Sequence, residues 1–299
     1  LELTSAMSGI PACSVLVLWG ATDDNAVAFR NARSALSYIL KAHRPICVWA
    51  PAFICPEALS AIPAGMAISY YSIAPDLSPD VAWLEARVKD GDCVLGVDYF
   101  GRSPGPDFLH LVSQRPDILW IEDRAQALHP AAAPWGDWVV YSPRKLFGVP
   151  DGGIAIRSNN KTDVVAQPCY EPVSDMAFMA ASLHRFEEPD GTGRADGYRL
   201  YQESEAAMSV GPVKMSRLTR ILLTMIDPTA PIARRKENYD VLADVLAPFA
   251  VFKGNAGSFA PLGFPVRHGD CDAVCSRLRD KGGLRSPALA LFTVAPRGV

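Results

Sequence analysis

The chain has 299 residues, of which 49% are hydrophobic and 20% charged, an ordinary globular composition that excludes disorder along the whole chain. The formal net charge is −3, so no basic excess is present to neutralise a nucleic-acid backbone, and we expect no nucleic-acid partner. No apolar stretch reaches the roughly 20 residues that span a bilayer, so we expect no membrane partner either.

Short apolar segments rich in β-branched and aromatic residues predict strands between residues 46 and 157. These segments are Ile46–Pro51, Ala67–Ile73, Cys93–Tyr99, Ile118–Asp123, Asp137–Ser142 and Gly152–Arg157. Helical patterns precede or separate them at Ala32–Ala42, Cys55–Ile62, Pro79–Lys89 and Pro106–Gln114, the third with Ser78 as its expected N-cap. This alternation predicts an α/β fold, a three-layer and mostly parallel sheet.

After residue 157 the pattern changes. Glu187–Tyr198 is a Gly- and Asp-rich segment that we expect to be a mobile loop. Two long helices are expected over about Gln202–Met225 and about Pro231–Leu246, followed by a strand over Ala260–Arg267 and a helix around Asp270–Lys281. We therefore expect a large α/β domain over residues 1–200 and a smaller C-terminal α+β domain over residues 201–299.

The cysteines indicate neither a disulfide framework nor a metal site. They are seven in number, without a CxxC pair, and the pair Cys271 and Cys275 has no nearby His to complete a zinc set. The first residues do not resemble a secretory signal. We expect reduced thiols, no metal and a cytoplasmic protein.

Polar side chains follow the ends of the predicted strands, where ligands bind in open parallel sheets. Asp123 and Gln126 follow one strand, Ser142 and Lys145 follow the next, and a helix opens at Asn31–Ser34. A helix N-terminus can bind an anion through its N–H groups. A carboxylate, an amine and an anion site together are what pyridoxal phosphate requires of a protein.

The local sequences carry a more specific signal. Residues 121–127 (IEDRAQA) resemble the E-D-x-A-Q-A segment of the sugar aminotransferase family usually called DegT/DnrJ/EryC1/StrS, which are fold-type I pyridoxal-phosphate enzymes. Residues 136–153 resemble its G-D…S…K…G-D-G-G segment, and residues 31–36 (NARSAL) stand where the family has S-G-T-A-A-L. The helix at residues 234–239 (RRKENY) is similar to a later family helix.

The resemblance implies the aspartate-aminotransferase fold and a role for each matching residue. Lys145 would form the Schiff base with pyridoxal 5'-phosphate and shuttle the proton between the substrate Cα and the cofactor. Asp123 would pair with the pyridinium nitrogen, and Gln126 would donate a hydrogen bond to the 3-oxygen of the ring. Ser142 would contact the phosphate. A homodimer is also implied.

The phosphate loop departs from the family pattern. Arg33 and Ser34 would offer backbone N–H groups to the phosphate, but Ala32-Arg33 replaces the usual Gly-Thr, so Arg33 could add its own charge. Ser142 and Lys145 are three residues apart instead of the usual five. The aromatic residue that often stacks on the cofactor aligns with Cys55, and Phe53 is the other candidate. Residues 286–299 do not resemble the family, so the C-terminal domain is expected to be shortened or altered.

The sequence leaves three functions open. The first is an aminotransferase that moves an amino group from a donor such as glutamate to a keto acceptor, for which a nucleotide-linked keto sugar is one candidate. The second is a different reaction with the same cofactor, such as a lyase, decarboxylase or dehydratase reaction. The third is a cofactor-free relative that acts as a binding protein.

Overall fold

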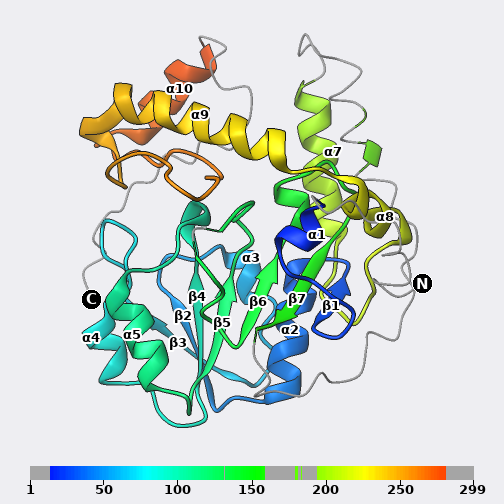
Figure 1. Cartoon of the computed structure of the whole chain (residues 1–299), viewed down its shortest axis with the longest axis vertical. Coiled ribbons are helices and arrows are strands. Elements are labelled where there is room, and N and C mark those ends of the chain that lie inside the picture. The colour runs from blue at the N-terminus through cyan, green and yellow to red at the C-terminus, as the bar shows by residue number, and fades with distance from the viewer. Residues whose placement is uncertain (1–13, 131, 159–178, 181–182, 184–193, 281–299) are drawn as a thin grey trace.

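The fold is built on one seven-stranded mixed sheet (Figure 1). The computed structural model describes residues 14–130, 132–158, 179–180, 183 and 194–280. Its strands are β1 Ala26–Phe29, β2 Cys47–Pro51, β3 Ala67–Tyr71, β4 Cys93–Val97, β5 Leu119–Asp123, β6 Trp138–Tyr141 and β7 Gly153–Arg157. Its helices are α1 Val15–Leu18, α2 Ala32–His43, α3 Pro56–Leu59, α4 Val81–Glu85, η2 Tyr99–Gly101, α5 Pro106–Gln114, η3 Pro143–Lys145, α7 Arg194–Ala207, α8 Arg217–Met225, α9 Thr229–Leu246, η4 Ala247–Phe249 and α10 Cys271–Asp280.

The strand order is β1-β7-β6-β5-β4-β2-β3. The neighbours from β3 to β6 pair in parallel, whereas β7 runs antiparallel to both β6 and β1. The parallel strands therefore end at a common edge, and Figure 1 shows α9 lying across that edge.

The predicted strands are confirmed to within two residues at each end. All six apolar segments form strands, and five of them are largely buried on both faces of the sheet. The sixth, β3, lies at the edge of the sheet, where Ala67, Ile68 and Tyr70 are exposed. The strand β1 was not predicted. It has only four residues, and the polar segment Thr22–Asn25 precedes it, so it offers too short an apolar run to indicate a strand.

Among the predicted helices, α2 and α5 are confirmed almost to the residue, whereas α3 and α4 are shorter than expected. The predicted cap of the third helix was wrong. Asp80, and not Ser78, is the N-cap of α4, and its carboxylate accepts a hydrogen bond from the N–H of Trp83 at 3.1 Å. Pro79 instead pairs with Ile73 in an isolated bridge, which keeps it outside the helix.

The later part of the chain corrects other predictions. The single helix expected over 202–225 was wrong: α7 ends at Ala207 and α8 begins at Arg217, and Gly211-Pro212 lies in the break. The strand expected over 260–267 was also wrong, because this segment contributes only isolated bridges at Ala260 and Val266. Residues 194–198 of the expected loop begin α7, while 187–193 and 281–299 lie outside the described residues.

The core fills both faces of the sheet. On one face, α2 packs Ile39 and Leu40 against Trp138 and Val140. On the other face, α1 and α8 cover a cluster that includes Tyr141. None of the helices in the described part of the chain is long and apolar enough to cross a membrane. The helices cover the two faces of the sheet, and α9 lies across its carboxyl edge.

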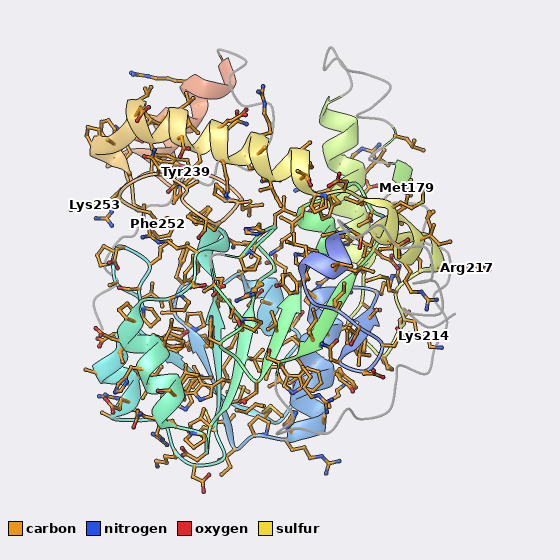
Figure 2. The ribbon with its side chains drawn as sticks, in the orientation of Figure 1. Met179, Lys214, Arg217, Tyr239, Phe252 and Lys253 are labelled. Carbon is orange, nitrogen blue, oxygen red and sulfur yellow. The ribbon has the colours of Figure 1, made fainter. Side chains whose placement is uncertain are left out.

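Aromatic contacts attach the C-terminal segment to the rest of the molecule. Tyr239 is the buried residue of α9, and Figure 2 shows it close to the loop that carries Phe252. The ring centroids of Phe252 and Phe100 are 6.2 Å apart, and the Arg102 guanidinium lies 4.9 Å above the Phe252 ring. The N–H of Leu262 donates to the carbonyl oxygen of Phe100 at 3.0 Å. The loops after α9 therefore rest directly on the turn that follows β4.

Candidate functional site

Two predicted site residues, Asp123 and Ser142, belong to the same face of the sheet. In strands, alternate residues share a face, so Asp123 lies on the side of Ile121, and Ser142 continues the alternation of Trp138 and Val140. Ile121, Trp138 and Val140 all pack in the core cluster under α2. Because Asp123 is paired with Val140, the two polar side chains lie at the same edge, on the α2 side.

Lys145 lies close enough to Asp123 for their charges to interact. Burial raises the pKa of the Asp123 carboxyl above its ordinary value, while the ammonium group of Lys145 and the N–H of Ala125 act in the opposite direction. That N–H donates to Asp123 Oδ1 at 2.8 Å. Lys145 ends the η3 turn directly after Ser142, and its side chain is exposed. An amine and a carboxylate therefore share one open site.

Gln126 is fixed by its side-chain oxygen. The N–H of Phe100 donates to Gln126 Oε1 at 2.7 Å, and Phe100 has a φ of 58°, a left-handed conformation that few side chains adopt. Because Oε1 is taken by a backbone donor, the Nε2 amide group is the end of Gln126 that can donate to a ligand. The predicted donor role of Gln126 is compatible with this arrangement.

The start of α2 is held by the segment that follows α7. Asn31 caps the helix, and its Oδ1 accepts the N–H of Ser34 at 2.8 Å, so this N–H is already engaged. The Ser34 hydroxyl accepts from the N–H of Gly211 at 3.1 Å. Arg33 directs its guanidinium to the carbonyl oxygen of Met208 at 2.8 Å. Of the two residues predicted to bind a phosphate at this helix, Arg33 directs its side chain to Met208, while the N–H and the hydroxyl of Ser34 both form hydrogen bonds within the chain.

Cys55 and Phe53, the two candidates for stacking on a cofactor, differ in their surroundings. Phe53 packs against Tyr99, with ring centroids 5.5 Å apart, and the Tyr99 hydroxyl donates to the carbonyl oxygen of Phe53. Cys55 donates its thiol to Glu57 at 2.6 Å, and the Lys145 ammonium acts on the pKa of both groups. Cys55 therefore stands on the Lys145 side, and Phe53 belongs to the aromatic cluster around Tyr99.

A buried ionic cluster lies behind the end of β5. Arg124 is 1% exposed, and its Nε donates to Glu122 at 2.5 Å and lies 3.4 Å from Asp98. It also donates to the Tyr141 hydroxyl at 3.2 Å. One guanidinium serves two buried carboxyls, so burial and mutual repulsion raise the pKa of Asp98 well above its ordinary value. This cluster fixes the backbone on both sides of Asp123.

Sequence reasoning missed the contribution of α7. Arg144 donates through Nη1 to the Met208 sulfur at 2.9 Å and forms an ion pair with Glu205. No motif marks residues 204–208, and they lie more than sixty positions after Arg144, so no local pattern could have indicated the contact.

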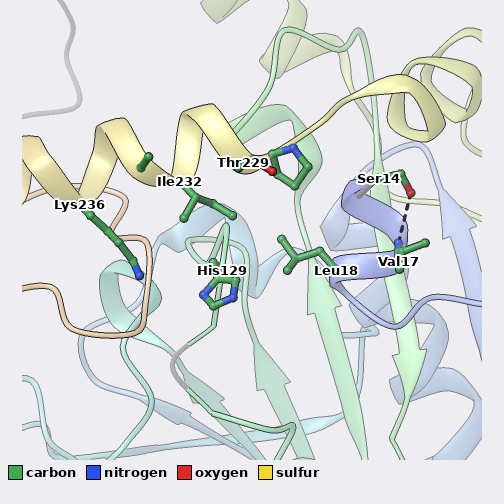
Figure 3. Close-up of a pocket in the computed structure, with 9 residues that line it drawn as sticks. Ser14, Val17, Leu18, His129, Thr229, Ile232 and Lys236 are labelled. Carbon is green, nitrogen blue, oxygen red and sulfur yellow. Dashed lines mark hydrogen bonds between the residues drawn. The ribbon is translucent and has the colours of Figure 1, made fainter. Parts of the chain in front are cut away.

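A separate cavity of about 600 Å³ lies on the α1 side of the sheet, under the first turns of α9 (Figure 3). It is lined by Ser14, Val17, Leu18, His129, Pro228, Thr229, Ile232, Ala233 and Lys236. None of the predicted site residues lines this cavity. Among the described residues, no group of three or more His, Cys, Asp or Glu side chains could hold a metal ion.

The fold is that of the fold-type I pyridoxal-phosphate enzymes, the aspartate-aminotransferase architecture. The aminotransferase TlmJ from Streptoalloteichus hindustanus matches with a TM-score of 0.58 and 16% identity, over 90% of this chain and 73% of that one. The sugar aminotransferase CalS13 from Micromonospora echinospora matches with a TM-score of 0.55 and 17% identity, over 94% and 75%. Spr1654 from Streptococcus pneumoniae, in its PMP form, gives 0.57 and 15%, over 90% and 72%.

No family model matches the sequence, and no curated protein sequence matches it. At 15–17% identity these matches show the fold alone, and they confirm the expected three-layer, mostly parallel α/β fold.

Proposed function

We propose that this protein is a pyridoxal-phosphate-dependent aminotransferase. The observation that carries the proposal is the placement of Asp123, Ser142 and Lys145 at one edge of a fold-type I sheet, with the Lys145 charge acting on Asp123. The structural neighbours that are sugar aminotransferases support the same chemistry. Many α/β proteins have polar residues at the ends of their strands. In this protein the amine, the carboxylate and the hydroxyl lie together on the α2 side of the sheet.

The residues present fit the cofactor. The Asp123 carboxylate, half-buried and held by the N–H of Ala125, is suited to keep a pyridine nitrogen protonated. Ser142 and the Arg33 guanidinium provide a neutral and a charged donor for a phosphate. When bound, pyridoxal phosphate supplies an electron-accepting ring that stabilises negative charge on the substrate Cα.

Each side chain then has a defined task. Lys145 would hold the cofactor through its amine and would carry the proton at the substrate Cα, and its exposed position gives it access to substrate. Gln126 would donate from Nε2 to the ring oxygen of the cofactor, while the N–H of Phe100 holds Gln126 Oε1. Arg144 cannot replace Lys145, because a guanidinium stays protonated and does not form an imine.

The substrates and the assembly belong to the same proposal. The amino donor is an amino acid such as glutamate, and the acceptor is a keto compound. The neighbour CalS13, a sugar aminotransferase, supports a keto sugar as the acceptor, and the family resemblance adds a nucleotide-linked keto sugar as one candidate. We further propose a cytoplasmic homodimer with a large domain over residues 1–200 and a smaller domain over 201–299. Met215, just before α8, and Leu223, within α8, both pack into a core cluster of the large domain. The segment around α8 therefore connects the two domains.

The proposal is tested by reconstitution and labelling. Pyridoxal phosphate is added to the purified protein, the visible spectrum is recorded, and borohydride reduction is followed by peptide mass spectrometry. A visible band with the label on Lys145 supports cofactor binding, and conversion to the pyridoxamine form by glutamate supports aminotransfer. A label scattered over surface lysines would overturn the proposal, and a correct label without a half-reaction for any common amino donor would overturn the aminotransferase assignment.

A further inference from the structure

Two guanidinium groups converge on the end of α7. Arg33, in the first turn of α2, donates to the carbonyl oxygen of Met208 at 2.8 Å. Arg144, between Ser142 and Lys145, donates to the sulfur of the same residue at 2.9 Å. Both guanidinium groups therefore meet at Met208, one at its backbone oxygen and the other at its side chain.

Acidic side chains partly balance these cations. Glu205 pairs with Arg144, whose side chain is 8% exposed, while that of Glu205 is 31% exposed. On the other side, the hydrogen bond from Cys55 and the charges of Arg33 and Lys145 lower the pKa of Glu57. Two neighbouring guanidinium groups repel each other unless an anion lies close to both. In this structure Glu205 supplies a single carboxylate, and it does so from the partly exposed side.

A buried hydroxyl group lies in the last turn of α7. Ser204 is 1% exposed, and within the part of the chain that the structure describes its hydroxyl meets no hydrogen-bond partner. Ser204 lies in the last turn of α7, and Met208, the residue that both arginines contact, directly follows the end of this helix. A buried hydroxyl without a partner is unfavourable, so its presence points to an acceptor that the described residues do not supply.

We propose that Arg33, Arg144 and Ser204 form a binding site for a phosphate monoester, with Glu205 as the internal counterion that the phosphate displaces. The inference rests on the proposed function, in which this phosphate is the one of the cofactor. A phosphate monoester carries a charge of about −1.5 to −2 at neutral pH and several acceptor oxygens, so it can bridge two guanidinium groups as one carboxylate does not. The end of α7 then acts as an internal competitor that sets the affinity for the cofactor.

The first experiment removes the competitor. Glu205→Gln keeps the size of the side chain but removes its charge, so the phosphate no longer displaces an ion pair or meets a nearby carboxylate. We expect pyridoxal phosphate, titrated by its visible absorption, to bind about three- to tenfold more tightly, the range of one charge-assisted hydrogen bond that no longer has a competitor. Pyridoxal, which lacks the phosphate, should bind as it does to the unchanged protein.

The matched control is Glu203→Gln. Glu203 lies on the same helix and pairs with Arg199, and both side chains are 58% exposed. This variant carries the same change of charge two residues away, so its affinity should stay at that of the unchanged protein. The proposal is overturned if Glu205→Gln binds pyridoxal phosphate no more tightly than Glu203→Gln, or if it changes pyridoxal binding equally.

A second variant and a second probe separate this proposal from the proposed function. Inorganic phosphate should raise the melting temperature of the unchanged protein, more so in Glu205→Gln and less in Ser204→Ala. If pyridoxal phosphate gives no visible band but these phosphate shifts follow the stated order, the proposed function fails and the anion site stands. If the band forms on Lys145 while neither variant alters either phosphate response, the function stands and the anion site is wrong.

Discussion

The N–H of Phe100 and the side-chain oxygen of Gln126 are joined by a hydrogen bond of 2.7 Å, which links the turn after β4 to the loop after β5. The two ends of the Gln126 amide therefore have different roles. The oxygen holds the backbone in a left-handed turn, and the nitrogen remains for a ligand. Structure and binding can therefore be separated by substitution at this one position.

Gln126→Glu keeps an acceptor for Phe100 and loses the amide donor. We expect its unfolding free energy to stay within about 0.5 kcal/mol of the unchanged protein, and its affinity for pyridoxal phosphate to fall about tenfold. Gln126→Leu loses both ends and should also lower the unfolding free energy by about 1–3 kcal/mol, because a buried N–H is left without its acceptor. Urea unfolding and cofactor titration measure the two effects. Equal stability of the two variants would contradict the division of roles.

Lys145→Ala should abolish the visible band and the borohydride-fixed label, because this residue is the amine beside Asp123. Lys89, an exposed lysine between α4 and β4, provides the control: Lys89→Ala should be labelled on Lys145 as the unchanged protein is. Peptide mass spectrometry after reduction gives the result. Persistence of one specific label in Lys145→Ala would move the covalent site to another lysine.

Asp98→Asn should change the pH dependence of stability. Burial and the neighbouring Glu122 raise the pKa of Asp98 in the folded protein, so the folded state holds this proton more tightly than the unfolded chain. The resulting stability is complete below the ordinary Asp pKa, about 4, and is lost as the pH rises through the folded value. Removing the proton site should therefore favour the variant increasingly with pH, by about 1 kcal/mol for each pH unit in that window.

This prediction is measured by urea unfolding between pH 4 and 8. Asp107→Asn, at an exposed position in the first turn of α5, is the control and should run parallel to the unchanged protein. The Asn side chain can still accept the hydrogen bond that Trp135 Nε1 donates to Asp98 at 3.1 Å, so packing is kept. Parallel curves for Asp98→Asn as well would show that Asp98 is ionised throughout.

Gly153→Ala should disrupt the seat of α2. A Cβ atom at this position would lie 2.1 Å from the carbonyl carbon of Asn31 and 2.3 Å from the N of Ala32, both backbone atoms. We expect a loss of about 3 kcal/mol in unfolding free energy, at the upper end of the range for overpacking. Gly148→Ala is the control, because a Cβ there meets no heavy atom within 4 Å. A small effect at Gly153 would mean that β7 can move away from α2.

Most of the sheet could be predicted because six of its strands are short apolar runs, and five of these are buried between two layers of helices, while β3 forms an exposed edge. The polar edge could be predicted because Asp123 ends one of those strands, Ser142 directly follows the next, and Gln126 and Lys145 lie within four residues of the strand ends. β1 escaped prediction because four residues are too few to establish a pattern. Gly211-Pro212 marks the break between α7 and α8 in the sequence, although the apolar residues on both sides of it favour one continuous helix.

The rest of the site could not be read from local pattern. The contacts that Arg33 and Arg144 make with Met208 join positions 175 and 64 residues apart. Helical periodicity indicates which side of α7 faces inward, but only the three-dimensional fold decides what that side meets. The N–H of Ser34 was expected to be available to a phosphate, but it donates to the side chain of Asn31. Asn, Ser and Asp all cap helices in this way, and the residue type alone does not show whether the N–H is used by the cap or by a ligand.

The position of β7 between β1 and β6 has a consequence for folding during synthesis of the chain. β1 pairs with β7 through Ala26 and Ile156, so the first strand to be made waits for the last one before it has a neighbour in the sheet. At roughly 5–20 residues per second, the ribosome needs on the order of ten seconds to bridge that interval. During this time the start of α2 has neither Gly153 behind it nor α7 beside it. The sheet edge and the anion-binding corner should therefore form late and together, after the parallel strands are already in place.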